Sequence, residues 1–412
     1  MMNIGVIGAI GVDDIGDVVM LEAGLKLLQD ICNDNCIEIK FTIFALDTKL
    51  AREQVKKIGI DADVVSCLRV DELPNDFLTS LRFQDLLKIN IEEKSSNHEY
   101  FHFFSKCDAL FFIGGGYFNK YWKDKLISTF VIPIALGYQQ NKLIYISGVN
   151  IGPFDEMQIN RLEGLFKNVD TLILRDRAPS IEILKKLGGT RGKLLLGSDD
   201  ILPRWYKQYN DDENKTYKKE LNYAIIHLHH WVEKFSQNSI EFYKTLSSFL
   251  NKLLDSKYLD RVYFLPFDYF KGLDYECGRR LKTYMDDRED YIVLEPTRDH
   301  IFMRQMISKS KFVLASRYHP VVFGMGEQVP TLGICVNDLY KQKISGAYEV
   351  VNVNLDDNMI YIDDFSYEGL MKWYEFAQKE DCLQINKMKK IIDTYYINKR
   401  ISTEKFIIRV GR

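Results

Sequence analysis

The sequence predicts an α/β protein with two domains, each built on a parallel β-sheet. Its 412 residues exceed the usual size of one domain and suit two. Short apolar runs alternate with segments whose apolar residues recur at helical spacing, which is typical of parallel strands joined by crossover helices. A polar, charged stretch separates two such series. The three observations together predict one sheet on each side of a linker.

The expected domain bounds follow from these patterns. We expect an N-terminal domain over 1–205, a linker over 206–220, a C-terminal domain over 221–366 and a helical segment over 367–412. The linker is predicted from its lack of apolar periodicity. Ligands of open parallel sheets bind beyond the carboxyl ends of the strands, so we expect the two domains to face a cleft. The helical end of the chain is expected to pack back and brace it.

The first strand is expected at residues 3–8, followed by the Gly-rich segment GAIGVDDIGD and a helix over 18–31. Glycines at such a turn permit either positive φ or the close approach of a ligand, and both interpretations stay open. The spacing differs from G-x-G-x-x-G, so it does not predict a dinucleotide site. Later strands of the first half are expected at 38–45, 62–67, 109–113, 143–147 and 171–174, with a last one inside 192–200.

Strand ends of the first half carry glycine or arginine. The apolar run 109–113 indicates a central strand buried on both faces, and it stops at Gly114–Gly116. A loop with unusual φ explains one or two of these glycines more easily than three, which favours a ligand-facing loop. A second Gly-rich loop is expected at 148–154, and the strand at 171–174 leads to Arg175 and Arg177.

The second half repeats the alternation. Strands are expected at 223–228, 261–266, 292–294, 312–315 and 331–335, with helices at 239–254, 275–284, 300–309 and 321–327. Arg317 and His319 follow the strand at 312–315. An R-x-H tripeptide alone more often reflects an ion-paired Arg and a structural His than a catalytic pair. Its position at a strand end favours a pair that faces a ligand.

Composition excludes several classes of function. The chain has 55 basic and 58 acidic residues, so no overall positive charge attracts nucleic acid. Seven scattered cysteines contain no C-x-x-C pair and indicate reduced thiols rather than a zinc set. The first residues lack the basic flank of a secretory signal, and no apolar run is long enough to cross a bilayer. We therefore expect a cytoplasmic protein; contact with a membrane surface and the oligomeric state stay open.

Six motifs in order carry a family resemblance: DDIGD at 13–17, FFIGGGYF at 111–118, SGVNIGPF at 147–154, LRDRAPS at 174–180, ASRYHPVVFGMGEQVPTLGI at 315–334, and Lys343 at the end of NDLYKQK. Their order and spacing over most of the chain resemble the polysaccharide pyruvyl transferases, which move the enolpyruvyl unit of phosphoenolpyruvate onto a sugar as a ketal. The resemblance implies two Rossmann-like domains in a GT-B-like architecture. The family often has Asn and Glu around its first Gly-Asp, where this chain has Asp14 and Val18.

The resemblance also implies roles for particular residues. Arg317 and His319 match the family's R-x-H, and Arg175 matches the Arg of its R-D motif. A guanidinium grips a phosphate or carboxylate with two parallel hydrogen bonds, and a His titrates near neutral pH. The predicted catalytic residues are His319 and Arg317, and the predicted substrate-binding residues are Arg175, Arg177, Asp17, Gly114, Gly115, Gly116, Ser316 and Lys343. We expect no metal and no cofactor.

Alternatives remain at this stage. The same fold would suit a nucleotide-sugar glycosyltransferase or a non-catalytic carbohydrate-binding protein. The expected partners are phosphoenolpyruvate as donor and a glycan, nucleotide-sugar or lipid-linked sugar as acceptor. His229-His230-Trp231 follows a strand and suits either stacking on a sugar or a structural loop. Asp199 and Asp200 suit either hydroxyl binding or capping of the linker.

Overall fold

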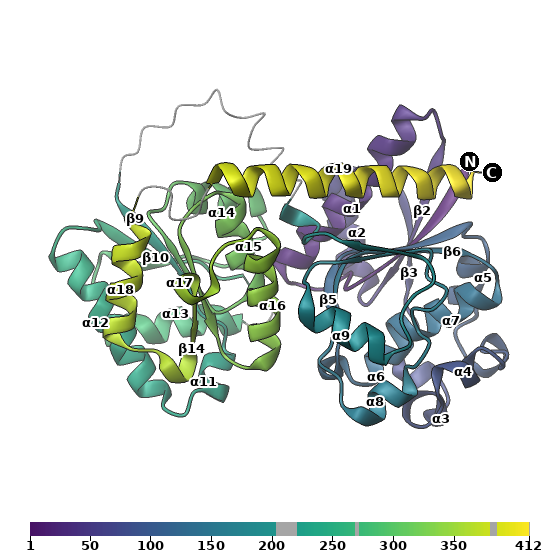
Figure 1. Ribbon diagram of the computed structural model, residues 1–412, viewed down its shortest axis with the longest axis horizontal. Helices are drawn as coiled ribbons and strands as arrows, with labels where there is room; N and C mark the ends of the chain where they lie inside the picture. The colour runs from purple at the N-terminus through teal and green to yellow at the C-terminus, as the bar shows by residue number, and fades with distance from the viewer. Residues whose placement is uncertain (203–220, 268–271, 380–384, 412) are drawn as a thin grey trace. The chain divides into compact units, whose positions relative to one another are not determined.

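The computed structural model describes residues 1–202, 221–267, 272–379 and 385–411 (Figure 1). The chain forms two compact units. Unit 1 comprises Met1–Val12, Asp17–Asp200 and Tyr395–Arg412, and unit 2 comprises Asp13–Gly16 and Ile201–Thr394. The expected linker, 206–220, lies outside the described residues, so the predicted domain bounds remain predictions.

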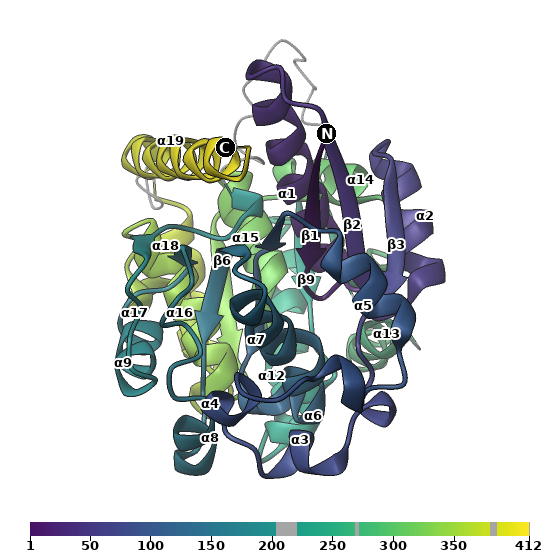
Figure 2. The same ribbon diagram turned by 90° about the vertical axis from the view of Figure 1, so that its right-hand side faces the viewer.

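Unit 1 is built on a parallel sheet. In the described residues it has eight strands in the order β3-β2-β1-β4-β6-β7-β8, with β5 paired to β6. Figure 2 shows β1, β2 and β3 side by side. The strands are β1 (Met2–Ile7), β2 (Ile39–Ala45), β3 (Ala62–Ser66), β4 (Ala109–Phe112), β5 (Gly115–Phe118), β6 (Leu143–Ile151), β7 (Thr171–Leu174) and β8 (Lys193–Leu196).

Helices cover both faces of this sheet, because its central strands are apolar on both sides. Along β4, Phe111 packs with one hydrophobic cluster and Phe112 with another, as predicted for a strand buried on both faces. The helices of unit 1 are α1 (Ile15–Asp34, whose first two residues count with unit 2), α2 (Thr48–Ile58), α3 (Asn75–Thr79), α4 (Phe83–Leu86), α5 (His98–Ser105), α6 (Asp124–Leu126), α7 (Ile132–Gln139), α8 (Glu156–Arg161) and α9 (Ala178–Lys186).

Unit 2 has its own parallel sheet, with the order β11-β10-β9-β12-β13-β14 in the described residues. Its strands are β9 (Tyr223–His227), β10 (Arg261–Phe264), β11 (Tyr291–Val293), β12 (Val313–Ala315), β13 (Thr331–Cys335) and β14 (Met359–Tyr361). Its helices are α11 (Trp231–Phe235), α12 (Ser239–Asp255), α13 (Leu273–Tyr284), α14 (His300–Ser308), α15 (Tyr318–Gly326), α16 (Asp338–Val350), α17 (Leu355–Asn358) and α18 (Tyr367–Ala377). The two predicted parallel α/β sheets are confirmed.

Each sheet has a point where the strand order reverses. In unit 1 the chain builds outward from β1 to β3 on one side and from β4 to β8 on the other, so the reversal lies between β1 and β4. In unit 2 it lies between β9 and β12, where Ala315 is the register partner of His227. Ligands of open α/β sheets bind beyond the carboxyl ends of the strands at such points. This topology singles out the residues that follow β12 and β9.

Several local predictions were wrong. Gly115 and Gly116, predicted as part of a loop, open strand β5, and α1 begins at Ile15, three residues before the predicted start. Strand β6 continues to Ile151, through the segment predicted as a Gly-rich loop, because Val149 and Ile151 are buried and pair with β5 and β7. Helix α15 begins at Tyr318, three residues before the predicted start. The prediction began after Pro320, but proline is tolerated in the first turn of a helix. His319 therefore lies on a helix and not in a loop.

The last helix, α19 (Ile385–Val410), was predicted as part of a helical C-terminal segment. From Tyr395 onward it belongs to unit 1. The hydroxyl of Tyr145 on β6 lies 2.8 Å from that of Ser402 and 2.9 Å from that of Thr403. The ring of Phe406 packs on Tyr145 with the centroids 5.2 Å apart. In Figure 1 this part of α19 and α1 lie on the same face of the unit 1 sheet.

Candidate active site

Ser316 directly follows β12 and ties this strand to β9. Its backbone N–H donates to the carbonyl oxygen of His227 at 3.1 Å. Its hydroxyl oxygen accepts the backbone N–H of His229 at 2.7 Å. Ser316 thereby fixes the direction in which the chain leaves the sheet toward Arg317. Its role in substrate binding remains a prediction.

Arg317 lies between two carboxylates of unit 2. Its Nη1 donates to Oδ2 of Asp14 at 2.7 Å. Its Nε lies 3.2 Å from Oδ2 of Asp274, and its Nη2 donates to Oδ1 of the same residue at 3.4 Å. Only 11% of the Arg317 side chain is exposed, so the guanidinium needs such partners to offset its desolvation. The planar group is held in a fixed orientation, as recognition of a phosphate or carboxylate requires.

His319 lies in the first turn of α15 and shares Asp14 with Arg317. Its Nδ1 is 3.1 Å from Oδ1 of Asp14. Its Nε2 is buried and forms no hydrogen bond with any described residue. The two residues of the R-x-H motif are thus joined by a third, Asp14, which we did not assign to the site from the sequence.

Residues 13–16 belong to unit 2, and their side chains contact other residues of that unit. The two oxygens of Asp13 accept hydrogen bonds from Nε and Nη2 of Arg298, each at 2.9 Å. Oδ1 of Asp14 also accepts the backbone N–H of Gly16 at 2.9 Å. A Cβ at Gly16 would lie 1.8 Å from Nδ1 of His319. Gly16 therefore permits a close approach, which was one of the two interpretations of the Gly-rich segment. The group that approaches it is the imidazole of His319 and not a ligand.

Lys343 lies on α16, with its Nζ 5.8 Å from the centre of the Tyr340 ring. That ring packs on His229 and Trp231, with centroid distances of 5.5 and 5.7 Å. Burial lowers the pKa of His229 far below its ordinary value, and the charge of Arg317 and, to a smaller extent, that of Lys343 lower it further. The charges of Arg317 and Lys343 thus both act on His229, which follows strand β9. Binding of substrate by Lys343 remains a prediction.

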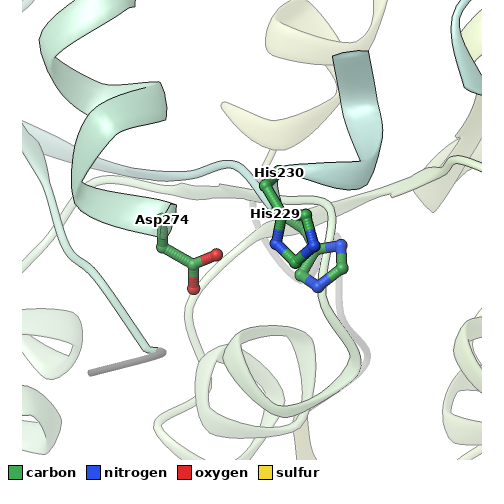
Figure 3. Close-up of side chains that lie close together, drawn as sticks. All are labelled: His229, His230 and Asp274. Carbon is green, nitrogen blue, oxygen red and sulfur yellow. The ribbon is translucent and has the colours of Figure 1, made fainter. Parts of the chain in front are cut away.

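Three side chains with metal-binding donors lie together beside Arg317: His229, His230 and Asp274 (Figure 3). One donor atom of each lies within 4.8 Å of the others. Figure 3 shows the Asp274 carboxylate directed toward the two imidazole rings, which come from consecutive residues at the end of β9. The cluster therefore has the composition of a candidate metal site.

The contacts of these donors do not suit a divalent cation. Asp274 already pairs with Arg317, whose positive charge would repel a metal ion at this position. Nδ1 of His229 accepts the backbone N–H of Trp231 at 3.2 Å, so the neutral ring carries its proton on Nε2 and offers no lone pair there. The residues fit a metal poorly, and metal-free chemistry remains our prediction.

Arg175 is buried after β7 in unit 1. Its Nη1 forms an ion pair with Oδ2 of Asp199 at 2.6 Å. Its Nε and Nη2 donate to Oδ1 of Asn150 at 3.3 and 2.9 Å. These contacts lie inside unit 1 and fix the guanidinium. Arg175 would therefore bind substrate while it keeps these contacts, and this predicted role remains a prediction.

Asp200 contacts three parts of unit 1, through two hydrogen bonds and one ion pair. The backbone N–H of Gly114 donates to its Oδ2 at 3.0 Å, and the hydroxyl of Ser147 donates to its Oδ1 at 2.8 Å. Nζ of Lys399 on α19 lies 2.5 Å from Oδ1. A Cβ at Gly114 would lie 2.9 Å from this carboxylate, and one at Gly148 would lie 2.4 Å from its Oδ1. Both glycines thus make room for a buried carboxylate.

The other predicted residues of unit 1 are buried or half-buried. Gly115 and Gly116 open β5, and the carbonyl oxygen of Gly116 accepts a hydrogen bond from Asn119 at 2.5 Å. Nη2 of Arg177 donates to the hydroxyl of Tyr395 at 3.3 Å. Asp17 lies in the first turn of α1, where a negative charge is favourable. Their roles in substrate binding remain predictions.

Sequence reasoning missed Asp14 and Asp274, the two carboxylates that hold Arg317. For Asp200 it proposed hydroxyl binding or capping of the linker, and not the contacts by which this carboxylate joins Gly114 to Lys399. The only signal for Asp14 was the departure of its loop from the family pattern. The sequence around Asp274 gave none, because an acidic residue at a helix start is common.

Solved structures of known proteins share this fold. UDP-GlcNAc 2-epimerase from Neisseria meningitidis, bound to UDP-GlcNAc, matches with a TM-score of 0.57 and 11% identity over 97% of this chain and 100% of its own. The epimerase from Methanocaldococcus jannaschii gives a TM-score of 0.56 and 13% identity over 92% and 93%. Anabaena HepE, in complex with UDP and glucose, gives 0.54 and 12% over 99% of both chains. The fold is thus of the GT-B class, as predicted.

Comparison with a protein-family model identifies the family within this fold class. The model of the polysaccharide pyruvyl transferases matches residues 14–337, which is most of the chain. The chain belongs to the polysaccharide pyruvyl transferase family, as the motifs predicted. The matched residues begin at Asp14 and include Arg317 and His319, whereas Lys343 lies beyond them. In the described parts of the chain, we find no helix both long and apolar enough to span a membrane.

Proposed function

We propose that this protein transfers the enolpyruvyl group of phosphoenolpyruvate to a pair of sugar hydroxyls, forming a pyruvate ketal during the synthesis of a cell-surface polysaccharide. Its family membership supports this class of reaction. The observation that carries the residue assignments is the position of Arg317 and His319 at the reversal point of the unit 2 sheet, joined by Asp14.

The proposed reaction has two bond-forming steps. The methylene carbon of phosphoenolpyruvate takes up a proton and becomes a methyl group, while one sugar hydroxyl adds to the neighbouring carbon and loses its proton. The second hydroxyl then loses its proton to the departing phosphate and bonds to that carbon as the carbon–oxygen bond to phosphate breaks. The products are the ketal and inorganic phosphate. Such chemistry needs a group that binds the donor's anions and a group that moves protons.

Arg317 is proposed as the anion-binding group. Phosphoenolpyruvate carries a phosphate and a carboxylate, and both match the hydrogen-bonding fork of a guanidinium. Asp14 and Asp274 fix the plane of Arg317 before the donor binds. They also offset part of its charge, so donor binding relies on geometry as well as on net attraction.

His319 is proposed as the proton-transfer group. A neutral imidazole can accept the proton of an attacking hydroxyl, and an imidazolium can donate one to departing phosphate. The contacts of Nδ1 leave Nε2 as the nitrogen for this task. The acceptor is proposed to be a glycan, a nucleotide sugar or a lipid-linked sugar, and Arg175, Arg177, Asp17, Gly114, Gly115, Gly116, Ser316 and Lys343 are proposed to contribute to binding.

Phosphate release from phosphoenolpyruvate tests the proposal directly. The full-length protein is incubated with the donor and a panel of free, nucleotide-linked and lipid-linked sugars, and products are examined by mass spectrometry. We expect phosphate release together with a product heavier by one pyruvate less one water. His319→Ala should lower kcat by about 10²- to 10⁴-fold, the usual contribution of acid–base catalysis. Arg279→Ala, at an exposed Arg of α13, is the matched control and should keep full activity.

The alternatives predict different results. A nucleotide-sugar glycosyltransferase would be stabilised against heat by a nucleotide sugar and not by phosphoenolpyruvate. A non-catalytic carbohydrate-binding protein would bind a glycan without turnover of any donor. Near-normal phosphate release by His319→Ala and Arg317→Ala would contradict the assignment of the site.

A further inference from the structure

Asp14 occupies an unusual position among the side chains of unit 2. One of its oxygens, Oδ2, accepts a hydrogen bond from Arg317 at 2.7 Å. The other, Oδ1, lies 3.1 Å from Nδ1 of His319 and accepts the backbone N–H of Gly16 at 2.9 Å. One carboxylate therefore contacts both residues of the R-x-H motif and is itself fixed by the backbone.

The contact with His319 has a chemical consequence. An ionised carboxylate can only accept hydrogen bonds, so the nitrogen that faces it must carry a hydrogen. In the neutral imidazole this places the single proton on Nδ1 and the lone pair on Nε2. Nε2 is buried and forms no hydrogen bond with any described residue. It is therefore the nitrogen available to a reacting group.

His229 shows that the opposite tautomer occurs in the same unit. Its Nδ1 accepts the backbone N–H of Trp231 at 3.2 Å, which leaves the proton of the neutral ring on Nε2. The partner of Nδ1 thus decides the tautomer at each position. At His319 that partner is a carboxylate, which is also held by a cation.

We propose that Asp14 is a positioning residue that holds His319 in its Nδ1–H tautomer and so directs Nε2 toward the substrate. The reaction that Nε2 serves is taken from the proposed function. The tautomer of His319 does not depend on that function, because it follows from the contact with Asp14. Asp14 acts through His319 and Arg317. An amide at position 14 could either donate to Nδ1 or accept from it, so it would no longer select one tautomer.

Nitrogen NMR of the full-length protein, labelled with ¹⁵N-histidine, tests the tautomer. His319 is assigned by comparison with His319→Gln. At a pH where the imidazole is neutral, we expect the wild-type protein to show Nδ1–H and Asp14→Asn to show a mixture of both tautomers. Asp13→Asn is the matched control in the same loop; it removes the negative charge that faces Arg298 and should leave the tautomer of His319 unchanged.

The kinetic experiment adds a second measurement. If Asp14 positions His319, Asp14→Asn should lower kcat for phosphate release about 10- to 100-fold, as expected for loss of a group that orients a catalytic residue. Asp14→Ala should lower it at least as much, and the isosteric Asn variant guards against misfolding of the Ala variant. The pH dependence of kcat should also shift in the Asn variant, whereas a purely structural loss would lower kcat equally at every pH.

The possible outcomes separate the two proposals. Absence of phosphate release in the wild-type protein would overturn the proposed function and leave the NMR test of Asp14 intact. A wild-type His319 in the Nε2–H form would overturn the inference. So would an unchanged tautomer and an unchanged kcat in both Asp14 variants of an active enzyme.

Discussion

Nζ of Lys399 lies 2.5 Å from Oδ1 of Asp200 and joins helix α19 to the end of the unit 1 sheet. The Asp200 side chain is 0% exposed and that of Lys399 is 10% exposed. Removal of one partner of such a pair leaves an uncompensated buried charge. We expect Lys399→Met to lower the free energy of unfolding by about 3–5 kcal/mol, measured by urea denaturation of the full chain.

Two further variants test the cause of that loss. Lys405→Met changes an exposed lysine of the same helix and should alter the unfolding free energy by less than about 0.5 kcal/mol. Adding Asp200→Asn to Lys399→Met should recover part of the loss, because the buried charge is then removed. An unfolding midpoint of Lys399→Met equal to that of the wild type would contradict the importance of this pair.

Gly16 offers a steric test of the position of His319. A Cβ at residue 16 would lie 1.8 Å from Nδ1 of His319, so Gly16→Ala must displace either the imidazole or the start of α1. We expect phosphate release to fall about 10²-fold or more, since small displacements of catalytic groups have effects of this size. Gly24→Ala in the same helix meets its nearest atom at 3.2 Å and should retain most of the activity. Equal activity of the two variants would argue against a fixed His319.

Arg317→Lys separates charge from geometry. Lysine keeps the positive charge but cannot form two parallel hydrogen bonds to one anion. Loss of one hydrogen bond to a charged group costs about 1.5–3 kcal/mol, so we expect kcat/KM for phosphoenolpyruvate to fall about 10- to 100-fold. Initial-rate kinetics over a range of donor concentrations provide the measurement. Full activity of the Lys variant would show that position 317 supplies only charge.

The buried His227 predicts a loss of stability in acid. Its pKa is held well below the ordinary value of 6.5, mainly by burial and then by the charge of Arg317; nearby Asp14 and the Leu265 carbonyl oppose this shift. The unfolded chain therefore binds a proton below about pH 6.5 that the folded chain does not bind. Stability is full above that pH and falls as the pH decreases. Burial lowers the pKa of His229 in the same direction.

Urea unfolding at pH 7.0 and 5.5 measures this effect. Each of the two histidines should contribute about 1 kcal/mol of lost stability over that interval. His227→Gln should reduce the difference between the two pH values, and substitution of the exposed His98 by Gln should leave it unchanged. A pH difference that is the same in the wild type and His227→Gln would contradict the assignment to His227.

Chelation tests the prediction of metal-free transfer. Incubation with a chelator, followed by removal of the chelator, should leave phosphate release unchanged. Asp274 is committed to Arg317, and His229 faces a backbone donor, so the three clustered donors are not expected to retain a metal ion. Loss of activity that a divalent ion restores would reverse this conclusion.

Much of the fold could be predicted because its signals are local. The alternation of apolar runs and helical periods predicted both parallel sheets, and the run at β4 indicated a strand buried on both faces. The start of α15 was missed, since a proline in the first turn obscures where a helix begins. The predicted loop after 147 became part of β6 because neighbouring strands pair with it.

The site was predictable only in part. The sequence determined that Arg317 and His319 follow a strand of a parallel sheet, and so face the edge at which ligands of such sheets bind. The tertiary structure alone decided that Asp14 lies between them, although it is 303 residues from Arg317 and 305 from His319 along the chain. The free energy of a charged contact depends on distance in space and on burial, and neither property can be obtained from local spacing in a sequence.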